Sequence, residues 1–197
     1  MYYLTQLAVR LWLRIFLGLR IEGSRDVPMR GGVLLCSNHI SNWDPVVLAA
    51  CLSRPVSFLA KEELFRIRWL KPIITKLHAY PIKRGAADHQ AMRTAVDVMK
   101  KGNLLVMFPE GTRKNHGSMV KIERGVGLLA IRANVIIVPA NISGSYRFFG
   151  RLRVKFGEPF LLTVQDDPSS SNRLSVDEAV EMIATHMRQL SGEGLRN

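Results

Sequence analysis

The chain has 197 residues, of which 47% are hydrophobic and 22% are charged; this fits one folded domain and excludes an intrinsically disordered chain. Its formal net charge of +12 favours an anionic partner, which can be nucleic acid, an anionic membrane surface or a phosphorylated substrate. Two cysteines, Cys36 and Cys51, are too few for a disulfide framework and lie at no zinc-binding spacing, so a reducing environment is expected.

Residues 1–20 are apolar and aromatic, but arginines interrupt them. They are a poor candidate for a membrane-spanning helix, which needs ~20 mostly apolar residues, and no small-residue cleavage site marks a secretory signal. Wound as a helix, the segment has one apolar face, made of Leu4, Leu7, Ala8, Leu11, Ile15 and Leu19. Trp12 widens that face, and Arg10 and Arg14 lie on the other side, so we predict a helix lying in a membrane interface with its arginines toward anionic headgroups. The alternative is a helix packed on the protein's own core.

Strand and helix patterns then alternate along the chain. Short apolar runs bounded by turn residues predict buried strands at 33–36, 56–60, 104–108 and 135–138. Helical spacing predicts helices at 45–52, 92–99 and 125–134, and Ser175 with Glu178 forms a capping box before a last amphipathic helix. The run 152–156 alternates, as expected of a half-exposed strand near an edge. The pattern indicates an α/β fold with a largely parallel central sheet flanked by helices.

His39 and Asp44 follow the first buried strand. In a helix, residues five apart lie about 140° from each other, so the pair can meet only if His39 is on a turn. We expect that turn to lead into a helix with Asp44 as its N-terminal cap. The carboxylate would then hold one ring nitrogen and leave the other free as a general base. The alternative is chance, because an acidic residue often follows a histidine at this spacing.

A second motif, Phe-Pro-Glu-Gly-Thr-Arg at 108–113, follows another apolar strand. Its proline and glycine force a turn just past the strand end, and Arg113 can bind a phosphate through two parallel hydrogen bonds. Ligands of open α/β sheets bind at the carboxyl ends of the strands, where both motifs are expected. An ordinary surface turn is the competing interpretation.

Four ordered blocks resemble the glycerolipid acyltransferase family, in particular its bacterial 1-acylglycerol-3-phosphate acyltransferases. They are His39 with Asp44, the stretch 80–85 with Arg84 near its end, the motif at 108–113, and the apolar run 135–139 that closes on a proline. The resemblance extends from about residue 21 to about residue 160. It implies that His39 takes the proton of an acceptor hydroxyl while Asp44 orients the ring, without an acyl-enzyme. It also implies a substrate-binding set of Lys61, Arg84, Glu110, Gly111, Thr112, Arg113 and Pro139.

The resemblance further implies an enzyme of phospholipid biosynthesis that acylates lysophosphatidic acid to phosphatidic acid. The donor would be acyl-CoA or acyl carrier protein, with no metal or prosthetic group involved. No nucleic-acid partner is expected, because the sequence shows no helix-turn-helix or RNP-like signature. Residues 1–20 would form a membrane-associating helix and residues 21–197 the acyltransferase domain, peripheral or monotopic at the cytoplasmic face of the cell membrane. Other acceptors remain open, namely glycerol 3-phosphate or another lysophospholipid, and so does a non-catalytic anionic-lipid-binding protein.

Two positions qualify this interpretation. Glu123 occupies a place where members of the family often carry lysine, and Lys121 could substitute for it. Cys36 lies three residues before His39, and a Cys–His nucleophile would imply a covalent acyl-enzyme. Because Cys36 falls inside an apolar run, we expect it instead to be a buried small hydrophobic residue.

Overall fold

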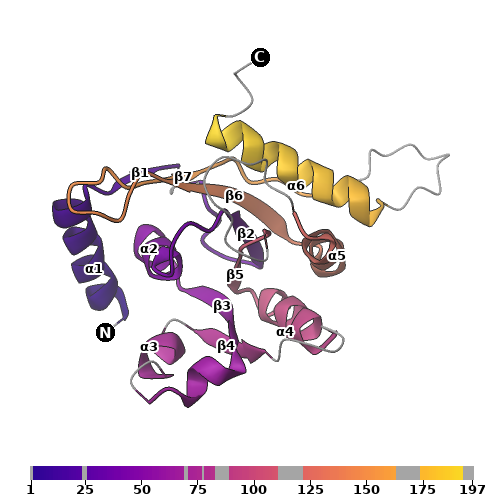
Figure 1. Cartoon of the computed structure of the whole chain (residues 1–197). Coiled ribbons are helices and arrows are strands. Elements are labelled where there is room, and N and C mark those ends of the chain that lie inside the picture. Colours follow the sequence, from indigo (N-terminus) through magenta and orange to yellow (C-terminus); the bar gives the residue numbers. More distant parts are fainter. Residues whose placement is uncertain are drawn as a thin grey trace.

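The computed structural model describes residues 2–23, 26–68, 71–76, 78–82, 89–110, 122–162 and 174–192. These residues form an α/β fold in which helices cover both faces of one sheet (Figure 1). The strands are β1 Arg20–Glu22, β2 Val33–Ser37, β3 Val56–Lys61, β4 Ala79–Ile82, β5 Leu104–Met107, β6 Ile136–Ser143 and β7 Arg153–Phe156. The helices are α1 Tyr2–Leu17, α2 Asp44–Cys51, the short 3₁₀ helix η1 Glu62–Arg66, α3 Lys71–Lys76, α4 His89–Lys100, α5 Arg124–Ala133 and α6 Val176–Ser191.

The sheet has the strand order β1-β7-β6-β2-β5-β3-β4. Every pairing between neighbours is parallel except that of β6 with β7, so the predicted largely parallel sheet is confirmed. The run predicted at 135–138 continues as a strand to Ser143. Strands β1 and β4 were not predicted from the sequence, because β1 has only three residues and β4 contains Pro81. Proline suits an edge strand, which β4 is.

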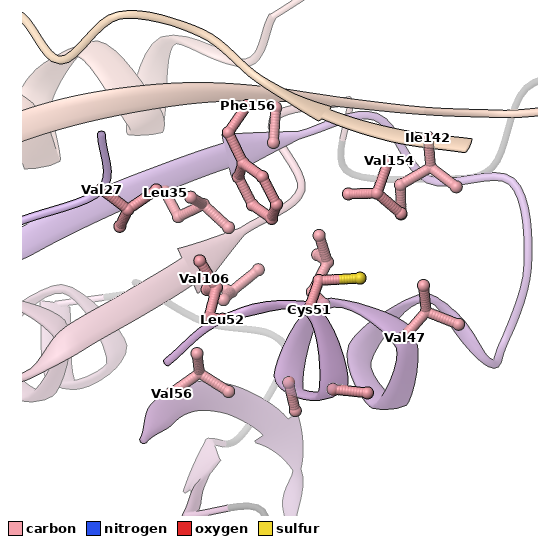
Figure 2. Packing of buried hydrophobic residues seen from close by; sticks show 14 of the residues in the cluster. Val27, Leu35, Val47, Cys51, Leu52, Val56, Val106, Ile142, Val154 and Phe156 are labelled. Atoms are coloured by element: carbon pink, nitrogen blue, oxygen red, sulfur yellow. The ribbon is translucent and has the colours of Figure 1, made fainter. Parts of the chain in front are cut away.

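The core lies in two layers, one on each face of the sheet. The layer on the α1 and α2 face contains Val33 and Leu35 of β2, and the layer under α4, α5 and α6 contains Leu34 and Cys36 of the same strand. Figure 2 shows the first layer, in which Leu35, Val106 and Phe156 of the sheet face Cys51, the last residue of α2, and Leu52, which follows it. Both layers contain residues of β2 that are completely buried, as a strand covered on both faces requires.

Helix α1 packs on α2 through a partly polar side. Leu13 and Leu17 are buried in the core, while Gln6 donates to the carbonyl oxygens of Ala49 and Leu52. Arg10 donates to the carbonyl oxygen of Ala50 at 2.6 Å. These bonds satisfy carbonyls at the end of α2 that have no partner within the helix. The prediction that Arg10 points to lipid headgroups is therefore wrong, because its guanidinium is turned inward.

The predicted apolar face of α1 is open to solvent. Leu4, Leu7, Leu11 and Ile15 are 73%, 52%, 49% and 61% exposed, and Trp12 beside them is 49% exposed. Leu19, which was assigned to that face, lies past the end of the helix and is buried. No helix among the described residues has the length and hydropathy needed to cross a membrane.

Strands β2 and β5 are parallel neighbours, with Cys36 beside Met107. The chain leaves β2 toward α2 on one face of the sheet and leaves β5 toward α5 on the other (Figure 1). Neighbouring strands whose connections diverge in this way form a topological switch point, where open α/β sheets bind ligands. Both sequence motifs begin at this edge of the sheet, just past Ser37 and Met107.

Candidate active site

The turn after β2 is fixed by Asn38. Its side-chain amide donates to the carbonyl oxygen of Ile142 on β6 at 2.8 Å, and its side-chain oxygen accepts from the Ile142 N–H at 2.7 Å. Because both bonds go to one residue of the neighbouring strand, the chain leaves the sheet in a defined direction. His39 is thereby presented at the carboxyl edge of the sheet.

His39 and Asp44 are in direct contact, with Nδ1 of the ring 2.6 Å from Oδ2 of the carboxylate. Oδ2 also accepts the backbone N–H groups of Ile40 and Ser41 at 2.7 and 2.8 Å. Asp44 is completely buried, whereas the His39 side chain is 19% exposed. A buried carboxylate needs such a set of donors, because an ionised group without them would be strongly destabilised.

The predicted role of Asp44 as the N-terminal cap of α2 is wrong. Trp43 occupies the cap position and no side chain caps the helix. Asp44 is the first residue of α2, and its carboxylate turns back to the N–H groups of the preceding turn rather than forward to those of the helix. Its two backbone donors therefore belong to the same turn as His39, which fixes the ring and the carboxylate relative to each other.

Tyr146 completes the carboxylate's hydrogen bonds and was not foreseen from the sequence. It lies in the loop after β6, and its hydroxyl donates to Oδ1 of Asp44 at 2.5 Å. Burial, together with the neighbouring carboxylate, raises the pKa of Tyr146 well above its usual range. The tyrosine is therefore a neutral donor at any ordinary pH. No local pattern marks it, because it lies three residues past the end of β6 and its partner is 102 residues away in the sequence.

Phe108 positions the ring of His39 from the other side. It follows β5 directly, and the two rings stack with centroids 4.1 Å apart and planes inclined by 21°. An ionised carboxylate only accepts hydrogen bonds, so the neutral imidazole carries its proton on Nδ1 and leaves the Nε2 lone pair available. Stacking and the bond to Asp44 together fix the direction of that lone pair, as a general base requires.

The other predicted site residues are only partly described. Lys61 is the exposed last residue of β3, at the same edge of the sheet as His39, and Glu110 is half-buried three residues past β5. Pro139 is buried within β6 beside Cys36, on the face covered by α6 and away from α2. The structure therefore does not bring Pro139 to His39. Arg84, Gly111, Thr112 and Arg113 lie outside the described residues, as does Lys121.

Cys36 is completely buried, and that burial raises the pKa of its thiol to about 12. A thiol with so high a pKa is almost entirely protonated at neutral pH and is a poor nucleophile. The prediction of a buried hydrophobic residue is confirmed. Within the described ranges, no group of three or more histidine, cysteine, aspartate or glutamate side chains could hold a metal ion.

Comparisons with known proteins identify the family of the chain. A family model described as "Acyltransferase" matches residues 18–143. A relative from Bacillus subtilis, named 1-acyl-sn-glycerol-3-phosphate acyltransferase, is 26% identical over 166 residues, which cover 81% of this chain and 82% of the relative. A relative of the same name from Streptococcus pneumoniae is 32% identical over 162 residues, which cover 79% of this chain and 57% of the relative. The chain thus spans little more than half of the second protein.

A solved structure shows the same fold. The crystal structure of PlsC, the 1-acyl-sn-glycerophosphate (LPA) acyltransferase from Thermotoga maritima, matches with a TM-score of 0.69 and 22% identity. The match covers 99% of this chain and 79% of that one. Since the family model spans well over half of the residues and includes both motif-bearing strands, the chain belongs to the acyltransferase family.

Proposed function

We propose that this acyltransferase transfers a fatty acyl group from a thioester donor to the free hydroxyl of 1-acylglycerol 3-phosphate, giving phosphatidic acid. The names of the relatives support the acceptor. The observation that carries the chemistry is the contact of 2.6 Å between His39 Nδ1 and Asp44 Oδ2 at the sheet's carboxyl edge. It gives an oriented imidazole with one free ring nitrogen at the place where such sheets bind ligands.

In the proposed reaction, Nε2 of His39 takes the proton of the acceptor hydroxyl as the oxygen attacks the carbonyl carbon of the thioester. The resulting tetrahedral intermediate collapses with loss of the thiolate, which takes the proton back from the imidazolium. Asp44 stays ionised and stabilises the imidazolium while it exists. General-base catalysis of this kind contributes ~10²–10⁴-fold in rate. The attack is direct, and the buried Cys36 takes no part in it.

The acceptor's phosphate is assigned to three basic side chains. Arg84 and Arg113 would bind it, with Lys61 adding charge from the end of β3. Glu110, Gly111 and Thr112 would contact the glycerol part of the acceptor. The position of Lys61 at the carboxyl end of a strand next to β5 supports its assignment. Pro139 would act indirectly, through the packing of β6 against β2.

We also assign α1 to the bilayer surface, with residues 21–197 as the acyltransferase domain. The support is its exposed row of Leu4, Leu7, Leu11 and Ile15, which the protein leaves uncovered. Deleting α1 would also remove Leu13 and Leu17 from the core, so the sharper test replaces Leu7 and Leu11 by serine. That variant should fold normally and bind anionic vesicles more weakly. Unchanged binding would contradict the assignment.

The function itself is tested by an acyl-transfer assay with lysophosphatidic acid, glycerol 3-phosphate and lysophosphatidylcholine in parallel. Acyl-CoA and acyl carrier protein thioesters serve as donors. Transfer to lysophosphatidic acid should be lost in His39→Ala and retained in His89→Ala, a control on the exposed start of α4. Preference for another of these acceptors would revise the proposed substrate but not the proposed mechanism. Turnover by His39→Ala would refute the general-base role.

A further inference from the structure

The loop between β6 and β7 presents two adjacent phenylalanines to solvent. Phe148 and Phe149 are 70% and 75% exposed, more than any other large apolar side chain of the described residues except Leu4. Burial of such side chains is strongly favourable, so two of them together at a loop tip indicate a surface that is covered when the protein works. They take no part in the His39 site described above.

The loop has a closed and well-supported structure. The Ser145 N–H donates to the carbonyl oxygen of Gly150 at 3.1 Å, and the Gly150 N–H donates to that of Arg147 at 2.9 Å. A Cβ atom at Gly150 would lie 2.3 Å from the carbonyl oxygen of Ser145, so only glycine permits this closure. The backbone therefore holds the two phenylalanines at the tip.

The loop is joined to the end of α1. The Phe149 N–H donates to the carbonyl oxygen of Phe16 at 2.7 Å, and the rings of Phe16 and Phe148 meet edge to face with centroids 6.0 Å apart. The Leu152 N–H donates to the carbonyl oxygen of Leu17 at 3.1 Å. The exposed face of α1 and the phenylalanine loop therefore form one continuous apolar surface.

The charge of this surface selects its partner. Residues 1–21 and 135–157 contain no aspartate or glutamate, and Arg14, Arg147 and Arg151 are exposed on these two segments. An apolar surface whose two segments carry only cationic charge is complementary to a bilayer with anionic headgroups. A second copy of this chain would place arginines against arginines, which repel.

From these observations we propose that the loop 144–151 is a second membrane-binding element, which inserts Phe148 and Phe149 into an anionic bilayer beside α1. The inference rests on the proposed action on a lipid acceptor. Tyr146, which holds Asp44, is two residues from Phe148. Consecutive Cα atoms are 3.8 Å apart, so the inserted tip lies within ~8 Å of that tyrosine along the chain. The loop thus brings the His39 site to the membrane surface, where a lipid acceptor resides.

The test is cosedimentation with vesicles of phosphatidylglycerol and phosphatidylcholine, and with vesicles of phosphatidylcholine alone. The loop variant combines Phe148→Ser with Phe149→Asn, since asparagine tolerates the left-handed backbone (φ 57°) at that position. Its affinity for the mixed vesicles should fall ~100-fold or more, because each inserted phenylalanine is worth ~10-fold or more and the two factors multiply. Met29→Ser is the control, because Met29 is 57% exposed but precedes β2 at the opposite edge of the sheet.

Binding is measured without substrate, so it does not depend on the proposed reaction. If the wild type fails to acylate lysophosphatidic acid and the loop variant still loses vesicle binding, the proposed reaction is refuted and the membrane-binding role of loop 144–151 is supported. The loop variant should retain transfer to a water-soluble short-chain acceptor and lose transfer to a vesicle-embedded one. Two results would overturn the proposal: vesicle binding by the loop variant equal to that of the wild type, or a wild-type dimer that the loop variant abolishes.

Discussion

Asp44→Asn separates the two contributions of the carboxylate, its charge and its orientation of His39. The side chain keeps its shape, and three N–H groups, from Ile40, Ser41 and the His39 ring, converge on the oxygen at the Oδ2 position. The amide oxygen must occupy that position, since the amide nitrogen would meet three donors there. The amide NH₂ group then faces the Tyr146 hydroxyl, whose oxygen can accept a hydrogen bond from it. We therefore expect the proton of His39 to stay on Nδ1.

What the variant loses is the negative charge beside the imidazolium. The charge centres of a ring and a carboxylate in contact are about 4 Å apart. Two opposite unit charges at that separation attract by ~4 kcal/mol at an effective dielectric constant of ~20. Each ~1.4 kcal/mol is tenfold in rate, so full loss would lower kcat about 10³-fold. The amide dipole retains part of the attraction, so we expect a fall of ~10²–10³-fold in kcat with little change in KM.

The assay compares the kcat and KM of Asp44→Asn, Asp44→Ala and His39→Ala for lysophosphatidic acid, together with their free energies of unfolding. Asp44→Ala should be less stable than Asp44→Asn, because it leaves two backbone N–H groups and the Tyr146 hydroxyl without their acceptor. Activity of Asp44→Asn within about threefold of the wild type would refute the electrostatic reasoning. A loss equal to that of His39→Ala would show that orientation was lost as well.

Three further predictions concern buried groups. Tyr146→Phe should lower the free energy of unfolding by ~1.5–3 kcal/mol, the usual worth of a hydrogen bond to a charged group. Chemical denaturation of Tyr146→Phe, with the wild type and Asp44→Asn measured beside it, checks this value. Iodoacetamide at neutral pH should leave activity intact, because burial raises the pKa of Cys36 and Cys51 to about 12; rapid inactivation with labelling of Cys36 would contradict this. Arg54 donates to three backbone carbonyls at the amino-terminal edge of the sheet. Arg54→Met should therefore lower the free energy of unfolding by ~3 kcal/mol or more and leave kcat per folded molecule unchanged. A variant as stable as the wild type would refute this prediction.

The sequence was sufficient for the parts of the fold and site that depend on local patterns. Buried parallel strands appear as short apolar runs, and the capping box of Ser175 and Glu178 is present as predicted. The pair of His39 and Asp44 could be predicted because both lie within seven residues of one strand end. Asn38 and Tyr146 could not, because their partners are 104 and 102 residues away. Those contacts depend on which strands become neighbours.

Helix α1 shows a different limit of sequence patterns. Its periodicity correctly separates an apolar side from a side with arginines, yet the usual rule would turn the apolar side inward. The structure does the reverse at Gln6 and Arg10, whose side chains bond the carbonyls of α2. Periodicity identifies a face but cannot say what covers it. The acceptors for Arg10 become apparent only when α1 and α2 lie side by side.

The bonds of Gln6 and Arg10 to α2 have a consequence for the energetics of membrane binding. Many amphipathic segments are unfolded in water and become helical only at the bilayer, so part of their binding energy is spent on ordering the chain. Helix α1 is already formed and fixed on the protein by those bonds and by its buried Leu13 and Leu17. Such preorganisation removes the ordering penalty, and the helical content of the protein should stay constant as vesicles are added.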